Sequence, residues 1–149
     1  MYAITIKQPW VWAIFNAGKD IENRTWELQE KHLNTRVYIH SSAQNFKMFG
    51  RSNAFTDFEL ALVNVNKISG SNLTPEKFIA LPDLTYNFGA IIGSVEIIGC
   101  GWKSANHPSY SRWHQVGCCG FKLKDPILLP EPIFTKGQLG FWDCSEVVK

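Results

Sequence analysis

Residues 89–100 read GAIIGSVEIIGC, and this stretch decides the fold. Isoleucine and valine recur through it, and such branched side chains favour strands because they pack well on a pleated surface. Its glycines stand where a strand of a barrel can bend or lie close to a neighbour. We therefore expect a central strand of a curved sheet here.

Further strands are expected on both sides of this segment. Residues 2–7 alternate, with Tyr2, Ile4 and Ile6 on one face, which is the period of a half-buried strand. The other expected strands are residues 21–26, 36–40, 120–123 and 140–143, with prolines at 126, 130 and 132 interrupting the link between the last two.

A short buried helix is expected after the first strand. Pro9 can occupy its first position, and the run 10–17 is apolar almost all round. Gly18 can end it in a left-handed conformation. The chain would then turn directly into the 21–26 strand.

A helical insertion is expected at about residues 43–88. Thr56 and Glu59 have the spacing of a capping box, and apolar residues follow at helical spacing. Thr74 followed by Pro75 is a typical start for another short helix.

The order of these elements predicts the fold class. Strands separated by helices without regular βαβ spacing favour an α+β fold, in which a mixed, mostly antiparallel sheet closes into a β-barrel with flanking short helices. A chain of 149 residues, 45% of them hydrophobic, lies within the size of one independently folding domain. We therefore expect a single domain over residues 1–149.

The charge and hydropathy of the sequence limit the classes of partner that the protein is expected to bind. A net charge of +2 is well short of the basic surplus expected of a protein that holds long duplexes through phosphate contacts alone, although it allows a local basic patch. The sequence has no run of 18 apolar residues, and the opening MYAITIKQPW lacks the layout of a signal peptide. We expect a cytoplasmic protein with no membrane partner and no obligatory protein partner.

The sequence offers little support for a metal or cofactor site. His107 and His114 could join the cysteines in a zinc site, but the scattered spacing favours buried or idle thiols. No G-x-S-x-G elbow, phosphate-cradling glycine loop or H-E-x-x-H pair is present, so we expect no metal and no cofactor. The four cysteines contain no CxxC pair, so we expect them to be reduced thiols. They are Cys100, Cys118, Cys119 and Cys144.

Several segments together carry a family resemblance. Residues 8–10, QPW, are followed by residues 17–24, AGKDIENR, which fit a helix and then a G-x-K-x-x-E-x-R motif with alanine in place of its first glycine. Further matches are residues 37–42, VYIHSS, the strand at 89–98, and the ending 136–142, KGQLGFW. In this order and spacing the chain resembles the ASCH family of the PUA-like superfamily, in its bacterial or phage form.

The resemblance implies a PUA-like barrel associated with RNA, with a cleft between the first helix, the lysine-containing turn and the neighbouring strands. Some small bacterial relatives hydrolyse the acetyl amide of N4-acetylcytidine, and others are reported as ribonucleases. In the cytidine-deacetylating relatives a threonine occupies the position matched by Glu22, and their further acidic residue has no clear counterpart here. Their mechanism therefore does not transfer directly to this chain.

Lys19, Glu22 and Arg24 are the main candidates for the site. Lys19 follows a helix end and can anchor a phosphate or, if desolvated, take part in catalysis. Arg24 can present its planar fork to a phosphate or a base edge, with Glu22 orienting it or acting as a general acid or base. Structural alternatives stay open, because Lys19 can pair with Glu22 beside the helix dipole and Arg24 can form a structural ion pair.

Five further residues complete the candidate ligand-binding set. His40 and Ser41 lie at a strand end and can contact a base or a phosphate, although a capped strand end explains them equally. Trp10 and Trp113 can stack on a nucleobase, although a tryptophan more often belongs to the core. Lys136 lies beside a glycine that lets the backbone approach a ligand, although a plain β-turn explains it too.

Two functions stay open at this point. The first is a module that binds RNA or a modified nucleoside in a basic and aromatic cleft around residues 18–24, GKDIENR. The alternative is a metal-free hydrolase of an acylated cytidine, or a ribonuclease, with Lys19 as base or nucleophile and Glu22 handling protons. A protein scaffold is a third function, for which the sequence offers no motif.

Overall fold

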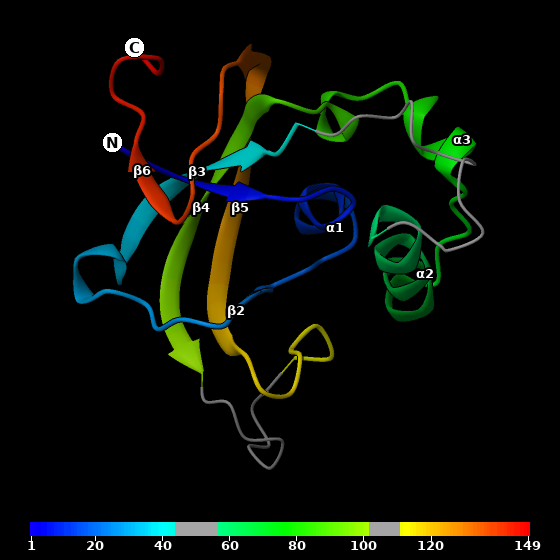
Figure 1. Cartoon of the computed structure of the whole chain (residues 1–149), viewed down its shortest axis with the longest axis horizontal. Helices are drawn as coiled ribbons and strands as arrows, with labels where there is room; N and C mark the ends of the chain where they lie inside the picture. The colour runs from blue at the N-terminus through cyan, green and yellow to red at the C-terminus, as the bar shows by residue number, and fades with distance from the viewer. Residues whose placement is uncertain (44–56, 102–110) are drawn as a thin grey trace.

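A computed structural model describes residues 1–43, 57–101 and 111–149, which form an α+β fold (Figure 1). The strands are β1 (Tyr2–Ile6), β2 (Ile21–Arg24), β3 (Thr35–Ser41), β4 (Ala90–Gly101), β5 (Cys119–Phe134) and β6 (Phe141–Asp143). The helices are α1 (Trp10–Asn16), α2 (Asp57–Ser69) and α3 (Pro75–Ile79), with 3₁₀ turns η1 (Glu30–His32) and η3 (Leu84–Tyr86).

The six strands form one curled sheet in the order β2-β5-β4-β3-β1-β6. The β1–β3 pair is parallel and the other neighbours are antiparallel, so the mixed, mostly antiparallel sheet is confirmed. The sheet is a half-barrel, because its end strands β2 and β6 do not pair with each other in the described residues. The closed sheet expected from the sequence is therefore corrected to an open one.

Aromatic packing joins the two ends of the sheet where strand pairing does not. The Trp26 ring, which follows β2, lies edge-on to Phe121 of β5 at 5.1 Å and to Phe141 of β6 at 5.7 Å. Phe121 and Phe141 stack at 6.1 Å between ring centroids. β2 consequently ends at Arg24, two residues before the expected limit. β2 and β6 are only 4 and 3 residues long, and these rings pack between them.

The last part of the sheet differs from the sequence expectation. β5 is one continuous strand of 16 residues that passes through Pro126, Pro130 and Pro132, where an interruption was expected. β2 pairs only with residues 119–122 of β5. Beyond them, β5 has a strand neighbour on one side only among the described residues, and a proline that lacks an N–H is tolerated along such an edge.

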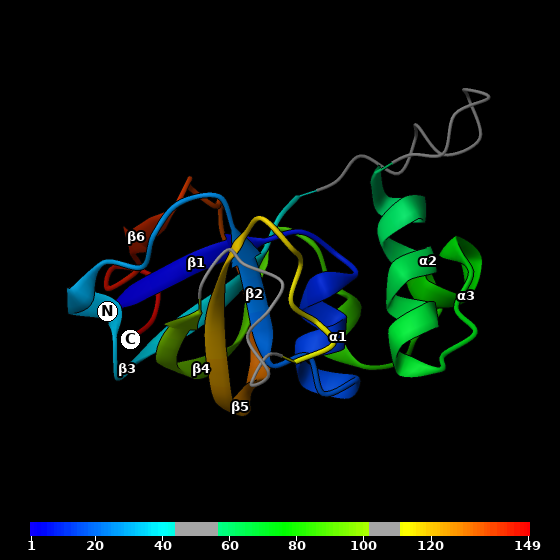
Figure 2. The ribbon, with the colours of Figure 1, turned by 90° about the horizontal axis from the view of Figure 1, so that it is seen from below.

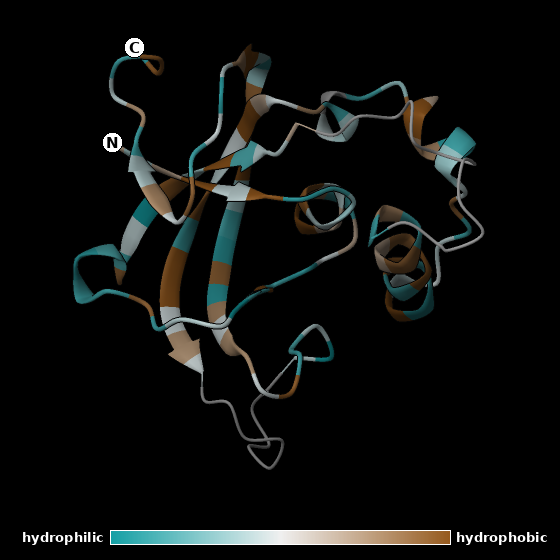
Figure 3. Ribbon diagram, viewed as in Figure 1, coloured by the Kyte–Doolittle hydropathy of each residue, from teal (hydrophilic) through white to brown (hydrophobic). Residues whose placement is uncertain are grey.

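α1 lies between the curled sheet and α2, and is therefore covered on opposite sides (Figure 2). Val11 and Ile14 pack in the main core inside the sheet, while Ala13 belongs to a cluster shared with α2. Figure 3 shows hydrophobic residues on α1 and along β4. Gly18 follows the helix with φ of +67°, and the Lys19 amide donates to the Ala13 carbonyl, so the expected left-handed ending is confirmed.

α2 and α3 form the helical part of residues 57–88. The Thr74 hydroxyl oxygen accepts from the Lys77 amide at 3.2 Å and Pro75 begins α3, as the sequence predicts. The cap expected at Thr56 lies outside the described residues. None of the helices within the described residues combines the length and the apolar character of a membrane span.

Gly93 of β4 tests how closely α1 packs on the sheet. A Cβ atom there would overlap the Ile127 carbonyl oxygen of β5 and lie 2.8 Å from the Phe15 ring of α1. We predict that Gly93→Ala lowers the free energy of unfolding by about 1–3 kcal/mol in urea denaturation, because the added methyl group overpacks against both the β5 backbone and α1. Gly99→Ala on the same strand is the control, since its Cβ meets only Lys122 Cβ at 3.7 Å. Equal stability of the two variants would contradict this packing.

Candidate functional site

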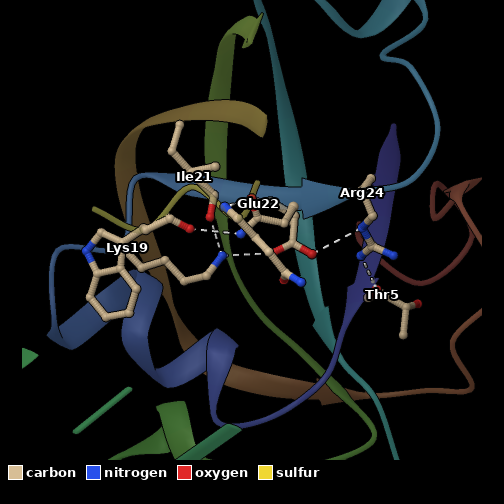
Figure 4. Close-up of polar contacts among 8 residues, drawn as sticks. Thr5, Lys19, Ile21, Glu22 and Arg24 are labelled. Atoms are coloured by element: carbon tan, nitrogen blue, oxygen red, sulfur yellow. Dashed lines mark hydrogen bonds and ion pairs between the residues drawn. The ribbon is translucent and has the colours of Figure 1, made fainter. Parts of the chain in front are cut away.

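Lys19 lies on the turn between α1 and β2, with only 2% of its side chain exposed. Its ammonium donates to the Glu22 carboxylate, with an Nζ–Oε2 distance of 2.9 Å, and to the Ile21 carbonyl (Figure 4). The Trp10 ring centroid lies 5.7 Å from Nζ, within the range of a cation–π contact. A buried charge requires such partners, so the fold specifies the position of this ammonium.

Glu22 and Arg24 point to the same side of β2, as residues two apart on a strand do. Glu22 Oε1 lies 3.1 Å from Arg24 Nε, and Arg24 Nη2 donates to the Thr5 carbonyl at 2.7 Å. The Glu22 carboxylate therefore bridges two cations, with Oε2 beside Lys19 and Oε1 beside Arg24. The ion pairs that the sequence left open as a structural alternative are present.

Two pockets open beside these three charged side chains. The first, which we call the Lys19 pocket, has a volume of about 360 Å³, and the second, the Arg24 pocket, about 340 Å³. Trp10, Glu22 and Asn23 line both, so these three side chains form a shared wall. The Lys19 pocket adds Lys19, Asn64, Ile68 and residues 112–115, and the Arg24 pocket adds residues 5–7, Arg24, Ser42 and residues 138–140.

The two candidate tryptophans differ in exposure. Trp113 lines the Lys19 pocket but is only 5% exposed, and its ring belongs to the cluster that joins α1 and α2. Its carbonyl accepts from Asn23 Nδ2 at 2.9 Å, and Asn23 Oδ1 accepts from the Gln115 amide at 2.8 Å, which holds this loop against β2. Trp10 is half-buried, so its indole is the more accessible of the two.

His40, Ser41 and Lys136 line neither pocket. His40 is 1% exposed and Ser41 is fully buried, whereas Lys136 is exposed. Their neighbours in the chain, Ser42 and Gln138, line the Arg24 pocket instead. The structure thus brings five of the eight candidate residues together around the pockets and leaves these three apart.

The segment after β5 explains why His40 is covered. The His40 ring nitrogen Nε2 lies 2.9 Å from the Thr135 carbonyl oxygen, and a Cβ atom on Gly137 would lie 2.6 Å from Nδ1. Only glycine lets the backbone pass this close to the ring. From the sequence, Gly137 was expected to let the backbone approach a ligand. In the structure it lets the backbone approach His40 instead.

Other lining residues gave no recognisable pattern in the sequence. Asn64 and Ile68 come from α2, and Lys7 from the turn before α1. The two α2 residues reach the pocket only because of where α2 packs, and no local sequence pattern reveals that position. Asn23 had the clearest indication, as a polar residue inside the cluster of charges at 18–24.

Metal-ligating and redox groups are scattered. Within residues 1–43, 57–101 and 111–149, no three His, Cys, Asp or Glu side chains are grouped closely enough to hold a metal ion. The four cysteines are free thiols.

No protein-family model matches this chain, and no curated protein matches it either.

Glu22→Gln tests the bridging carboxylate. The change leaves the buried Lys19 ammonium without a counter-charge, so we predict a loss of about 3 kcal/mol in the free energy of unfolding, measured by denaturant titration. Asp57→Asn is the matched control, because it removes an ion pair to Lys7 in which the two side chains are 66% and 87% exposed. That variant should unfold like the original chain. A Glu22→Gln protein of unchanged stability would rule out a structural role for the bridge.

The burial of His40 predicts a pH dependence of stability. Burial lowers the pKa of His40, and the hydrogen bond to Thr135 opposes this only in part. Since the folded-state pKa lies below the unfolded value near 6.5, the stabilisation is complete above about pH 6.5 and is lost as the pH falls through the folded-state pKa. His40→Gln should reduce the slope of unfolding free energy against pH below about pH 6.5, by at most about 1.4 kcal/mol per pH unit.

His32 provides the reference for that measurement. Burial, together with the charge of Lys31, lowers the pKa of His32 in the same direction, so His32→Phe should also reduce the slope. A slope that His40→Gln leaves unchanged would show that His40 is not held neutral by the fold.

Proposed function

We propose that this chain is an ASCH-type domain with a PUA-like half-barrel that binds RNA or a modified nucleoside at the Lys19 and Arg24 pockets. The observation that carries the proposal is the bridge at Glu22, which holds two cations at the edges of adjoining pockets that share an indole wall. A buried ammonium is costly, and such groups concentrate at functional sites.

The groups around the Lys19 pocket suit a nucleobase. The half-buried Trp10 ring offers a surface on which a base can stack. Asn64 and Gln115 carry side-chain amides that can both donate to and accept from a base edge. Lys19 uses two of its three ammonium hydrogens inside the protein, which leaves one for a ligand.

The size of the pockets and the charge of the chain favour a small contact area. Each pocket lies at the lower end of the range of about 300–1,000 Å³ typical of small-molecule sites. A net charge of +2 supplies little long-range attraction for a duplex. These properties support recognition of one or a few unstacked nucleotides.

Hydrolysis is the second candidate, favoured by the 2.9 Å contact between Lys19 and Glu22 beside the pocket. In this mechanism Glu22 takes a proton from a water molecule, whose oxygen attacks the acyl carbon of an acylated cytidine. Lys19 donates a hydrogen bond to the acyl oxygen as it gains negative charge, and the C–N bond then breaks as the leaving nitrogen receives the proton. The products are acetate and the free amine. Binding alone requires none of these proton transfers, so it is the first proposal.

Lys19→Met tests both functions. We predict that the original chain binds N4-acetylcytidine or short single-stranded RNA in calorimetric titration, and that Lys19→Met weakens binding at least about tenfold, because a charge-assisted hydrogen bond is lost. Lys31→Met is the control, since Lys31 is exposed and lines neither pocket. Trp10→Ala gives a second variant if Lys19→Met fails to fold.

Chromatography of the same samples separates the two functions. Release of acetate or cleaved RNA by the original chain, lost in Lys19→Met, would favour the hydrolase. Failure of the original chain to bind or convert any of these probes would contradict the proposed function.

A further inference from the structure

The Lys19 and Arg24 pockets are neighbours with different chemistry. Trp10, Glu22 and Asn23 border both, so the two pockets adjoin along these side chains. Beyond these shared residues the Lys19 pocket adds the Asn64 and Gln115 amides, which match a base edge, together with Arg112, His114 and the largely buried Trp113. A ligand that passes over the shared wall would enter the Arg24 pocket next.

The Arg24 pocket has the groups of a phosphate site. Lys7 contributes an ammonium whose side chain is 66% exposed, and its contact with Asp57 at 3.9 Å is between two exposed groups and therefore weak. Ser42 and Gln138 add a hydroxyl and an amide that can donate to phosphate oxygens. Apart from the shared Trp10, no aromatic residue of the described chain lines this pocket.

Arg24 is held in a fixed orientation for such a ligand. Its Nε faces Glu22 and its Nη2 donates to Thr5, while Nη1 makes no hydrogen bond to the residues that the structure describes. A guanidinium held by one ion pair and one hydrogen bond loses little entropy when it binds an anion through its remaining nitrogen. Because Glu22 also holds Lys19, one carboxylate sets the positions of both cations, and with them the separation of a base from a phosphate.

Leu139 adds an apolar contact at the rim of the Arg24 pocket. It is 98% exposed and precedes Gly140, whose φ of +65° turns the chain back towards β6. A leucine exposed to this degree gains stability only when something covers it. The sugar or base of a second nucleotide would lie against it once the phosphate is bound.

We infer that the two pockets are consecutive subsites for single-stranded RNA, with a base in the Lys19 pocket and the adjoining phosphate in the Arg24 pocket. A single nucleotide that carries a phosphate then fills both pockets, a free nucleoside fills only half of the site, and the next nucleotide of a strand lies against Leu139. This inference rests on the proposed function and extends it to the substrate class.

A comparison of nucleosides with dinucleotides tests the inference. The probes are the four ribonucleosides and the four matching homodinucleotides, titrated against the original chain by calorimetry. We expect the best dinucleotide to bind at least about tenfold more tightly than its nucleoside, and the gain to shrink with added salt as expected for one phosphate. Lys7→Met should lower the dinucleotide affinity about three- to tenfold and lower the ratio of dinucleotide to nucleoside affinity with it. Lys31→Met, outside both pockets, should change neither.

The outcomes separate the inference from the proposed function. Equal affinities for nucleoside and dinucleotide, or an equal loss of both in Lys7→Met, would overturn the consecutive subsites and leave nucleoside binding intact. Absence of binding by every probe would overturn both. Trp10→Ala should weaken both classes of ligand, because its ring borders both pockets.

Discussion

The carboxylate of Glu22 is the constraint on which the site depends. It places one oxygen 2.9 Å from the buried Lys19 ammonium and the other 3.1 Å from Arg24. Without it, two cations would lie close together in a poorly solvated region, and Lys19 could not stay buried. The strand geometry of β2 makes the bridge available, since residues two apart share a face.

The curled sheet and α1 give this bridge its surroundings. α1 ends at Asn16, and the left-handed Gly18 directs the chain so that Lys19 turns back under Trp10. The Arg24 side chain reaches across to the Thr5 carbonyl of β1, on the far side of the sheet order from β2. Such a contact is available only because the sheet curls, so the half-barrel and the site depend on each other.

Local patterns predicted the parts of the molecule that local forces determine. The alternation at residues 2–7, the apolar run of α1 with Gly18 after it, and the Thr74 cap follow from backbone geometry and nearest neighbours. The continuous β5 strand did not follow, because a proline is tolerated or excluded according to which neighbour lies beside it. The opening between β2 and β6 likewise depends on aromatic packing over long sequence distances.

For the site, the sequence by itself determined that Lys19, Glu22 and Arg24 would lie close together, since a turn and a short strand suffice to join them. Only the tertiary structure decided that they lie beside two pockets, that His40 and Ser41 are buried away from both, and that α2 supplies Asn64 to one wall. The physical reason is that a pocket is a space between elements. Its shape depends on how distant segments pack, and this information is absent from any local run of residues.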